Sequence, residues 1–413
     1  NQIYIKAYGS NGSSRNLTAD AAAGSTSVLV ASATGLTAGS WVLIGDNAEP
    51  DPAYAGRKAG ELVRIASIDG LTINLQSPLA FSFTTANSAF MRPITPVRNV
   101  GVTDLKVVNP YPGSTFVLGA YFARCVGVYV RNVRMEGMDN AGLGFEACAE
   151  FTVDNLTSVD FSSDDVGGRY GYGVMVIGAC TAGEVRNSRF INVRHGFTTG
   201  GVDAGYGQPT DITVSDCHAI GCKLAGFDTH AAASGITFIG CTARGGNTTY
   251  QPPGFQIRSN RTHVTACRVY DISGSGITIT GGAQDATVSG CDFRGVTDSG
   301  MYVDGDASGL SVIGNVFSDF GLHGIYFETT SGGTGIIVED NTFRDYSTGS
   351  GHWGIYVNGP VDFPVFQGNT FQNGYAAINI TASPVRPYIT DNRGYNMAAG
   401  SSWLSYAGST YRP

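Results

Sequence analysis

The chain has 413 residues, of which 14% are charged and 42% are hydrophobic, and its formal net charge is −8. An acidic chain is poorly suited to nucleic acid, because neutralising phosphates takes clustered Lys and Arg. No run of about 18 apolar residues occurs, so we expect no membrane-spanning segment.

The first 95 residues do not show the repeat that follows them in the chain. Residues 1–19 contain one extended run, 2–8, followed by a polar loop. Residues 20–95 contain four short apolar runs with Gly and Asp turns between them, at 27–30, 41–44, 62–65 and 71–75. We expect a small β subdomain here, which either covers the end of the following repeats or binds carbohydrate.

A repeat of 24 to 28 residues governs the chain from about residue 96 to residue 396. One position of this repeat is occupied in turn by Cys217, Cys241, Cys267, Cys291, Asn315, Asn341 and Asn369. Short β-rich runs separated by Gly, Asn and Asp turns at this period predict a β-solenoid, whose coils stack about 4.8 Å apart. Residues 397–413 form a polar tail after the last coil.

The eight cysteines follow the repeat and do not form pairs with metal-site spacing. No Cys-x-x-Cys pair occurs, and four of the cysteines share one coil position. The pattern predicts free thiols that fill a small apolar core position, and it predicts no disulfides.

This scaffold resembles the right-handed parallel β-helix of pectate lyases, alginate epimerases and phage tailspikes. The resemblance implies an all-β fold, namely a right-handed single-stranded parallel β-helix with the small N-terminal β subdomain. It also implies an extracellular protein, either secreted or part of a phage virion tail, and a homotrimer.

The stretch 226–230 carries an aspartate and a histidine at two positions where the later coils do not carry this pair. Side chains alternate along a strand, so Asp228 and His230 should point outward from the coil. The same register directs Arg258 outward in the next coil, and His195 lies just before the strand of the preceding coil. At the coil spacing of about 4.8 Å, we expect these four side chains within roughly 10 Å of one another on one flat face.

Three longer loops, at 162–172, 200–209 and 247–252, flank this coil and carry further candidates. Long loops on a tight scaffold tend to be functional. Asp164 and Asp165 are candidate catalytic carboxylates beside Asp228, His230, His195 and Arg258. Candidate substrate-binding residues are Glu146, Arg169, Tyr170, Tyr172, Arg194, Asp203, Tyr206, Tyr250 and Gln256.

Later coils carry a row of tyrosines at the outward positions, namely Tyr302, Tyr326 and Tyr356. Such a row is expected either to stack across neighbouring strands or to form a platform for sugar rings.

The stretch 226–230, Gly-Phe-Asp-Thr-His, is similar to the Gly-Phe-Asp-Pro-His stretch of β-helical mannuronan C5-epimerases. In that family the Asp and the His belong to the catalytic group that acts at C5 of a uronate. The resemblance implies catalytic roles for Asp228 and His230. Thr229 stands where the family has Pro, and Ala225 stands where the family has a catalytic Tyr.

Asp and His are also good ligands for divalent metals, so Asp228, His230 and His195 form an alternative metal site. Asp164 and Asp165 could bridge Ca²⁺. These residues establish no cofactor by themselves, and Ca²⁺ stays open as an alternative.

Three functions fit these residues, and all of them place a polysaccharide on the helix face. The first is β-elimination on an acidic polysaccharide, in which Arg258, Arg169 or Arg194 neutralises the uronate carboxylate and His230 or His195 is the base. The second is glycoside hydrolysis by Asp228 paired with Asp164, Asp165, Asp203 or Glu146. The third is glycan binding by a spike without cleavage.

Overall fold

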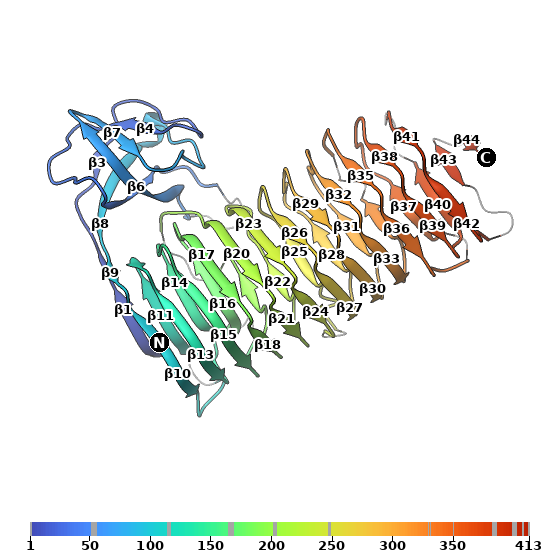
Figure 1. Cartoon of the computed structure of the whole chain (residues 1–413), viewed down its shortest axis with the longest axis horizontal. Helices are drawn as coiled ribbons and strands as arrows, with labels where there is room; N and C mark the ends of the chain where they lie inside the picture. The colour runs from blue at the N-terminus through green and yellow to red at the C-terminus, as the bar shows by residue number, and fades with distance from the viewer. Residues whose placement is uncertain are drawn as a thin grey trace. The chain divides into compact units, whose positions relative to one another are not determined.

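The computed structural model describes residues 2–50, 56–113, 117–163, 169–200, 205–246, 249–328, 330, 332–349, 351–381, 386–398, 403–406 and 409–411. Apart from one short 3-10 helix, η1 (Thr85–Asn87), the regular elements within these ranges are β-strands (Figure 1). No helix in this part of the chain is long and apolar enough to cross a membrane.

The chain folds as two compact units. Unit 1 comprises Asn1–Ser188, Phe197–Thr213 and Ala232–Ser234. Unit 2 comprises Arg189–Gly196, Val214–Ala231 and Gly235–Pro413.

Unit 1 contains an antiparallel sheet near the N-terminus, with the strand order β2-β8-β5-β6-β7-β4 and with β3 beside β8. Its strands are β2 (Ser10–Asn11), β3 (Arg15–Asn16), β4 (Ser27–Leu29), β5 (Trp41–Gly45), β6 (Gly60–Asp69), β7 (Thr72–Leu75) and β8 (Phe90–Thr95). One face of this sheet packs a core of its own, which includes Val30, Ile44 and Ile65.

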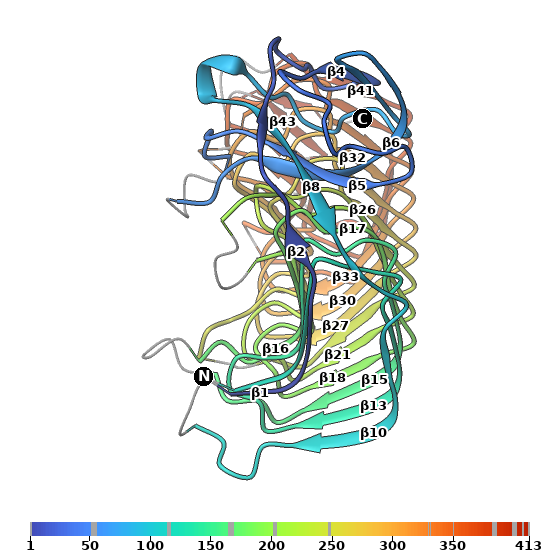
Figure 2. The same ribbon diagram turned by 90° about the vertical axis from the view of Figure 1, so that its left-hand side faces the viewer.

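The remaining strands of unit 1 form parallel coils (Figure 2). One sheet joins β1 (Gln2–Tyr8), β11 (Val117–Ala123), β14 (Ala141–Glu146), β16 (Tyr172–Ile177) and β19 (Phe197–Thr198). A second sheet joins β10 (Gly101–Val108), β13 (Tyr129–Glu136), β15 (Thr152–Val159) and β17 (Thr181–Arg186). β9 (Val97–Arg98) pairs with β12 (Cys125–Val126).

The first sheet of unit 2 contains the strands that carry most of the candidate residues. Its parallel strands are β22 (Phe227–Asp228), β25 (Phe255–Ile257), β28 (Ile277–Ile279), β31 (Met301–Val303), β34 (Ile325–Phe327), β37 (Trp353–Val357), β40 (Ala376–Ile380) and β43 (Leu404–Tyr406). β44 (Ser409–Tyr411) closes this sheet by antiparallel pairing with β43.

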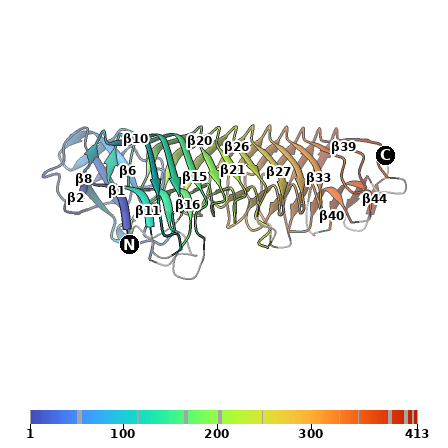
Figure 3. The same cartoon turned by 90° about the horizontal axis from the view of Figure 1, so that it is seen from below.

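Two further columns of parallel strands complete the coils of unit 2 (Figure 3). One column is β18 (Arg189–Ile191), β21 (His218–Ile220), β24 (Thr242–Arg244), β27 (Arg268–Ile272), β30 (Asp292–Val296), β33 (Val316–Phe320), β36 (Thr342–Arg344), β39 (Thr370–Gln372) and β42 (Arg393–Tyr395). The other is β26 (His263–Thr265), β29 (Thr287–Ser289), β32 (Ser311–Ile313), β35 (Ile337–Glu339), β38 (Val365–Gln367) and β41 (Tyr388–Thr390), which β20 (Thr210–Ser215) and β23 (Ser234–Ile239) precede in the chain. The predicted parallel solenoid is confirmed.

Stacking of coils explains why one residue type recurs at one position. All eight cysteines are buried and free, as predicted. After Cys291 the same column continues as asparagines, in which the side-chain amide of Asn315 donates to Asn341 Oδ1 at 2.9 Å. Asn341 donates in turn to Asn369 Oδ1 at 3.0 Å. A neighbouring column of phenylalanines stacks with ring centroids 4.9 to 5.1 Å apart, from Phe293 to Phe371.

A glycine precedes each of the strands β22, β25, β28, β31 and β34 in the first sheet of unit 2, because the chain approaches its neighbours closely there. A Cβ atom at Gly300 would lie 2.7 Å from the carbonyl oxygen of Gly324 and 2.5 Å from the ring of Phe317. Only glycine fits between the next coil and the phenylalanine column at this position.

Candidate functional site

The side chains of His195, Asp228, His230 and Arg258, all within unit 2, meet at one carboxylate. Arg258 Nη2 lies 2.7 Å from Asp228 Oδ1. His230 Nε2 lies 3.3 Å from Asp228 Oδ2, and His195 Nε2 lies 4.0 Å from the same oxygen. The structure therefore brings together the four residues that the coil register predicted to be close, and we call them the Asp228 cluster.

Parallel pairing of neighbouring coils positions the cluster. Asp228 on β22 lies opposite Gln256 on β25, so Arg258 is placed two residues beyond the end of that pairing. On the other side, the backbone N–H of Gly196 donates to Gly226 O at 2.8 Å and that of Leu224 donates to Arg194 O at 3.0 Å. These bonds place His195 beside the segment that leads into β22.

Thr229 holds Arg258 in place, a role that the sequence did not predict. The hydroxyl Oγ1 of Thr229 accepts hydrogen bonds from the backbone N–H of Arg258 at 3.0 Å and of Ser259 at 3.2 Å. The carbonyl oxygen of Thr229 accepts a third from Arg258 Nε at 2.9 Å. The signal in the sequence was the Thr that replaces the family's Pro between the Asp and the His.

Asp228 is ionised. Burial raises the pKa of this carboxyl, but the charge of Arg258 and the hydrogen bond from His230 outweigh burial and hold the pKa well below its ordinary value. With one oxygen bound to a guanidinium and the other facing an imidazole, the carboxylate cannot act as a proton donor near neutral pH.

His195 is neutral, and its tautomer follows from its backbone contact. Its Nδ1 lies 2.7 Å from the carbonyl oxygen of Ala225, which can only accept, so Nδ1 carries the proton and Nε2 carries the lone pair. Burial lowers the pKa of His195 to about 4, although Asp228 opposes this shift. At neutral pH the imidazole therefore adds no positive charge to the cluster.

His230 takes the opposite orientation toward the carboxylate. Its Nε2 side forms the hydrogen bond to Asp228, so Nε2 carries a proton, and its Nδ1 is buried. Asp228 thereby fixes the tautomer of His230, as a carboxylate does for a catalytic base.

Asp228 and His230, predicted to point outward from the coil, are buried. The side chain of Asp228 is 0% exposed and that of His230 is 5% exposed, whereas outward residues of the next coils, such as Thr278 and Tyr302, are half-buried. Three side chains close over the carboxylate at distances of 2.7 to 4.0 Å, which accounts for its burial. Arg258, with a quarter of its side chain exposed, is the most accessible member of the cluster.

Glu146 takes part in a different network, within unit 1. Its carboxylate lies 2.8 Å from Arg124 Nη1 and accepts a hydrogen bond of 2.6 Å from the Tyr121 hydroxyl. Burial, together with the charge of Glu146, raises the pKa of Tyr121 far above its ordinary value.

Arg169, Tyr170 and Tyr172, predicted to overhang the site, make packing contacts within unit 1. Arg169 Nη1 donates to the carbonyl oxygen of Gly113. The rings of Tyr170 and Tyr172 stack at 5.6 Å, and Tyr172 belongs to a buried cluster with Leu118 and other apolar side chains. These contacts account for the burial of Tyr172.

Tyr206 packs against the antiparallel sheet of unit 1. Its ring meets Phe90 edge-on at 4.9 Å, and its hydroxyl donates to Asn47 Oδ1 at 2.9 Å. A structural role in holding the loop 205–208 explains both contacts.

The remaining candidates divide into three groups. In unit 2, Arg194 lies close enough to His195 to depress the pKa of its imidazole further, and Gln256 lies opposite Asp228 in the sheet. Tyr250 is 65% exposed. Asp164, Asp165 and Asp203 lie outside the described residues.

Within the described ranges, no group of three or more His, Cys, Asp or Glu side chains has a geometry that could hold a metal ion. At the Asp228 cluster, the Arg258 guanidinium occupies the position beside the carboxylate that a cation would take.

Comparison with known proteins assigns the fold. A family model described as a right handed beta helix region matches residues 234–393. The tailspike protein gp49 from Pseudomonas phage LKA1 aligns with a TM-score of 0.68 at 17% identity, over 98% of this chain and 67% of that chain. The solenoid is a right-handed β-helix.

The β-helix also has a relative in sequence. A capsule K1-specific depolymerase of Klebsiella phage K64-1 is 26% identical over 254 residues, which are 59% of this chain and 27% of the relative. The Gp54 tailspike of Acinetobacter baumannii bacteriophage AP22, solved in complex with a capsular saccharide, aligns with a TM-score of 0.57 at 15% identity, over 96% of this chain and 64% of that chain. The chain thus spans about a quarter of the depolymerase and about two thirds of the tailspikes.

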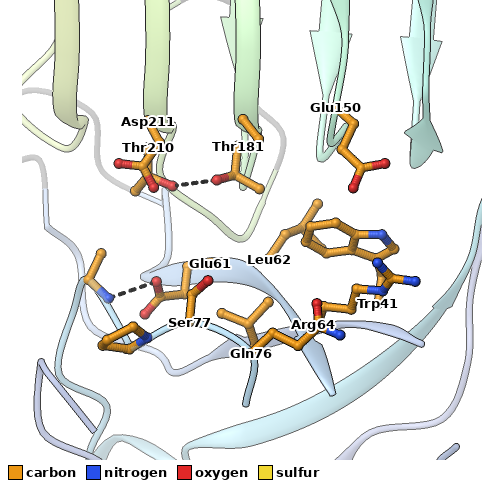
Figure 4. Close-up of a pocket in the computed structure, with 14 residues that line it drawn as sticks. Trp41, Glu61, Leu62, Arg64, Gln76, Ser77, Glu150, Thr181, Thr210 and Asp211 are labelled. Atoms are coloured by element: carbon orange, nitrogen blue, oxygen red, sulfur yellow. Dashed lines mark hydrogen bonds between the residues drawn. The ribbon is translucent and has the colours of Figure 1, made fainter. Parts of the chain in front are cut away.

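Unit 1 has a separate cleft, lined by residues of its antiparallel sheet and of its parallel coils, with a volume of about 250 Å³ (Figure 4). Trp41 and Arg64, which pair across strands β5 and β6, line it together with Glu150 and Asp211. Trp41 is a core residue at 8% exposure, and the carboxylate of Glu61 accepts the backbone N–H groups of Ala80 and Phe81 at 2.9 and 3.2 Å. Both groups are thus used in packing, and the lining shares no residue with the Asp228 cluster.

Proposed function

We propose that the chain is the β-helical part of a phage tailspike that degrades a bacterial polysaccharide, with the Asp228 cluster as its reaction centre. The observation that carries the proposal is the arrangement of His230 and Arg258 on one buried, ionised carboxylate. The sequence similarity to a capsule-specific depolymerase supports polysaccharide cleavage as the activity.

β-Elimination is the reaction that fits these groups best. Arg258 neutralises the carboxylate of a uronic acid residue, which acidifies the proton at C5. An imidazole of the cluster, that of His230 or of His195, takes that proton. The electron pair of the C5–H bond forms the C4=C5 double bond, and the C4–O bond breaks with its pair on the departing oxygen, which takes a proton from solvent or a tyrosine such as Tyr250.

Asp228 is a positioning residue in this mechanism. Its carboxylate binds Arg258 at 2.7 Å and His230 at 3.3 Å, so it fixes both the cation and the tautomer of the base. His195, neutral and held by the carbonyl of Ala225, supplies a second lone pair on the same side of the cluster.

Glycoside hydrolysis is the second candidate reaction, and it requires different catalytic groups. It needs two carboxyl groups, one of them protonated, at about 5–5.5 Å for retention or about 6.5–9.5 Å for inversion. Asp228 is held ionised and Glu146 is paired with Arg124, so the acid would have to be Asp164, Asp165 or Asp203.

The test uses the purified chain and a panel of acidic and neutral capsular polysaccharides. Reducing ends and the ultraviolet absorbance of an unsaturated uronate are followed together. Release of reducing ends with rising absorbance, lost in His230→Gln and Arg258→Gln, would support elimination at the cluster. The exposed His218, changed to Gln, is the matched control and should keep full activity.

Other outcomes have definite meanings. Reducing ends without absorbance would replace elimination by hydrolysis and direct attention to Asp164, Asp165 and Asp203. Cleavage that survives in both cluster variants would make the cluster a structural ion network. Binding without cleavage across the panel would identify a glycan-binding spike.

A further inference from the structure

We propose that Tyr302, Tyr326 and Tyr356 form a subsite that holds uncharged sugar residues of the glycan chain, about three to five coils away from the Asp228 cluster. We call these residues the tyrosine row. The proposal rests on the proposed function, because it assigns the row to the same polysaccharide.

The tyrosine row continues the line of the sheet that begins at Asp228. The strand registers place one residue of each successive strand directly opposite the next, in the order Asp228, Gln256, Thr278, Tyr302, Tyr326, Tyr356 and Asn379. Neighbouring parallel strands lie about 4.8 Å apart, so the row begins about 14 Å from Asp228 and ends about 24 Å from it. The strands β25, β28, β31 and β34 are successive neighbours in one sheet, and the first three are labelled side by side in Figure 1.

Successive rings of the row are in contact. The rings of Tyr326 and Tyr356 stack at 5.3 Å with an interplanar angle of 8°, and the ring of Tyr302 meets that of Tyr326 edge-on at 5.7 Å with an angle of 68°. All three tyrosines are half-buried, so each leaves part of its surface accessible. Tyrosine presents an apolar ring face beside a polar hydroxyl, which suits the alternating C–H and O–H groups of a sugar.

His323 supports the row from the adjacent turn. Its ring lies 5.1 Å from Tyr326 and 4.8 Å from Tyr356. Its Nδ1 accepts the backbone N–H of Trp353 at 3.3 Å, and burial lowers its pKa to about 4, so it packs as a neutral ring. The contacts with His323 hold the rings of Tyr326 and Tyr356 in place, which favours a binding surface that is formed before the sugar arrives.

A second row of polar side chains runs beside the rings, two residues further along each strand. It contains Thr280, Asp304, Glu328, Asn358 and Thr381, all at least partly exposed. Thr381 Oγ1 donates to Asn358 Oδ1 at 3.0 Å and also lies 3.5 Å from the Tyr356 hydroxyl. Apolar rings beside fixed hydroxyl, amide and carboxylate groups provide both stacking and hydrogen bonding for a sugar.

Charge separates this subsite from the Asp228 cluster. Burial and the carboxylates of Glu328, Asp304 and Asp298 raise the pKa of Tyr302. The same carboxylates repel an anionic sugar, whereas Arg258 and Arg194 attract one at the other end of the line. A glycan with charged and uncharged residues in its repeat would therefore place the uncharged ones on the tyrosine row.

The test compares Tyr326→Ala and Tyr356→Ala with wild type on a polymer and on oligosaccharides too short to span both sites. We expect KM for the polymer to rise by about fivefold, since stacking is worth about 1 kcal/mol, with kcat unchanged and with short oligosaccharides cleaved normally. Tyr326→Phe should retain most of the affinity. Tyr388→Ala, which changes a tyrosine 61% exposed on another strand column, is the matched control.

Several outcomes test the tyrosine subsite separately from the proposed depolymerase function. Normal polymer KM in both variants, with cleavage intact, would overturn the subsite alone. If wild type binds the polymer without cleaving it and the variants lose binding, the subsite stands and the depolymerase proposal fails. A changed oligomeric state in light scattering, with glycan binding unaltered, would assign the tyrosine row to a contact between copies of this chain and overturn the subsite.

Glu328 offers an independent check on the charge argument. Glu328→Gln removes the negative charge next to Tyr326 and keeps a side chain of similar shape. It should improve binding of an anionic polysaccharide at low salt and leave binding of a neutral one unchanged. An equal effect on both polymers would contradict the assignment of uncharged residues to the tyrosine row.

Discussion

Arg258 Nη2 lies 2.7 Å from Asp228 Oδ1, and this ion pair joins two successive coils of the β-helix. The carboxylate is 0% exposed, whereas a quarter of the arginine side chain is exposed. The pair therefore presents a cation at the surface and hides the anion that holds it. This asymmetry suits the recognition of a negatively charged sugar.

Asp228→Asn should uncouple the cluster without changing its shape. Breaking a buried pair by removing one partner costs about 3–5 kcal/mol, and we expect the lower end because Arg258 can turn toward water. Urea denaturation measures this loss. Activity should fall by about 10²–10⁴-fold, the usual contribution of a positioned acid or base, because His230 loses its fixed tautomer.

A stability loss alone could explain reduced activity, so the assay needs a temperature at which Asp228→Asn remains folded. Folded protein with unchanged activity would contradict the positioning role. Asp216→Asn, at an exposed position of the same unit, is the matched control.

Arg258→Lys keeps the positive charge but loses the planar fork. Lys carries all its donors on one nitrogen, so it loses the two separate donor atoms, Nη2 and Nε, with which Arg258 binds Asp228 Oδ1 and the carbonyl of Thr229 at 2.7 and 2.9 Å. We expect kcat/KM on an acidic polysaccharide to fall by about 10- to 100-fold, the range for one or two lost charge-assisted hydrogen bonds.

Arg258→Gln should reduce activity further, because it removes the cation as well. Steady-state kinetics on one acidic polymer gives the order wild type, Lys, Gln. An equal loss in the Lys and Gln variants would show that geometry alone matters and that charge neutralisation at the uronate does not.

Buried histidines should make the protein sensitive to mild acid. The pKa values of His195 and His323 are both lowered to about 4, from an ordinary value of about 6.5. Between these values the unfolded chain binds more protons than the folded chain, so stability falls as pH decreases from about 6.5 toward 4. Each histidine contributes about 1.4 kcal/mol per pH unit within that window.

Denaturant unfolding at a series of pH values measures the slope. His195→Gln should flatten it, and His218→Gln, at an exposed position, should leave it unchanged. The carboxylate of Asp228 acts at lower pH. Its depressed pKa stabilises the fold above the unfolded value of about 3.9, and this contribution is lost as pH falls through the lower folded value. A slope that His195→Gln does not alter would disprove the buried neutral histidine.

The sequence predicted what the coil register controls. The column of cysteines and asparagines, the parallel strands and the proximity of His195, Asp228, His230 and Arg258 all follow from a constant period. Burial of the Asp228 cluster did not follow, because alternation gives the direction of a side chain and does not show what covers it.

Loop residues were harder to place for a related reason. Tyr172 and Tyr206 lie in or beside loops without a period, so only their residue type suggested sugar binding. The structure instead packs Tyr172 in an apolar cluster and Tyr206 against Phe90. An aromatic side chain near a loop is used for packing as readily as for binding.

The cysteines should be unreactive in the folded protein. All eight are buried and free, and burial raises the pKa of the Cys222 thiol to about 12. Because the thiolate is the reactive form, iodoacetamide should label no cysteine in native protein and all eight after denaturation. A reducing agent should leave the melting temperature unchanged. Labelling without denaturant, detected by mass spectrometry, would contradict the stacked arrangement.

Asn341 should be among the residues on which stability depends most. It is 0% exposed, and its amide donates to Val312 O at 2.8 Å and to Asn369 Oδ1 at 3.0 Å. Its Oδ1 accepts the backbone N–H and the side-chain amide of Asn315, each at 2.9 Å. Asn341→Ala removes all four hydrogen bonds and leaves buried partners behind, so we expect a loss of about 3–5 kcal/mol, at about 1–3 kcal/mol per unsatisfied group with partial relaxation.

The chain itself offers the comparison variant, because earlier coils carry cysteine at this position. Asn341→Cys leaves a thiol that can accept a backbone N–H, as Cys291 Sγ does from Cys267 at 3.4 Å. Its free-energy loss in urea denaturation should therefore be smaller than that of Asn341→Ala. Equal losses would show that the amide donors, and not the shared coil position, determine stability in this column.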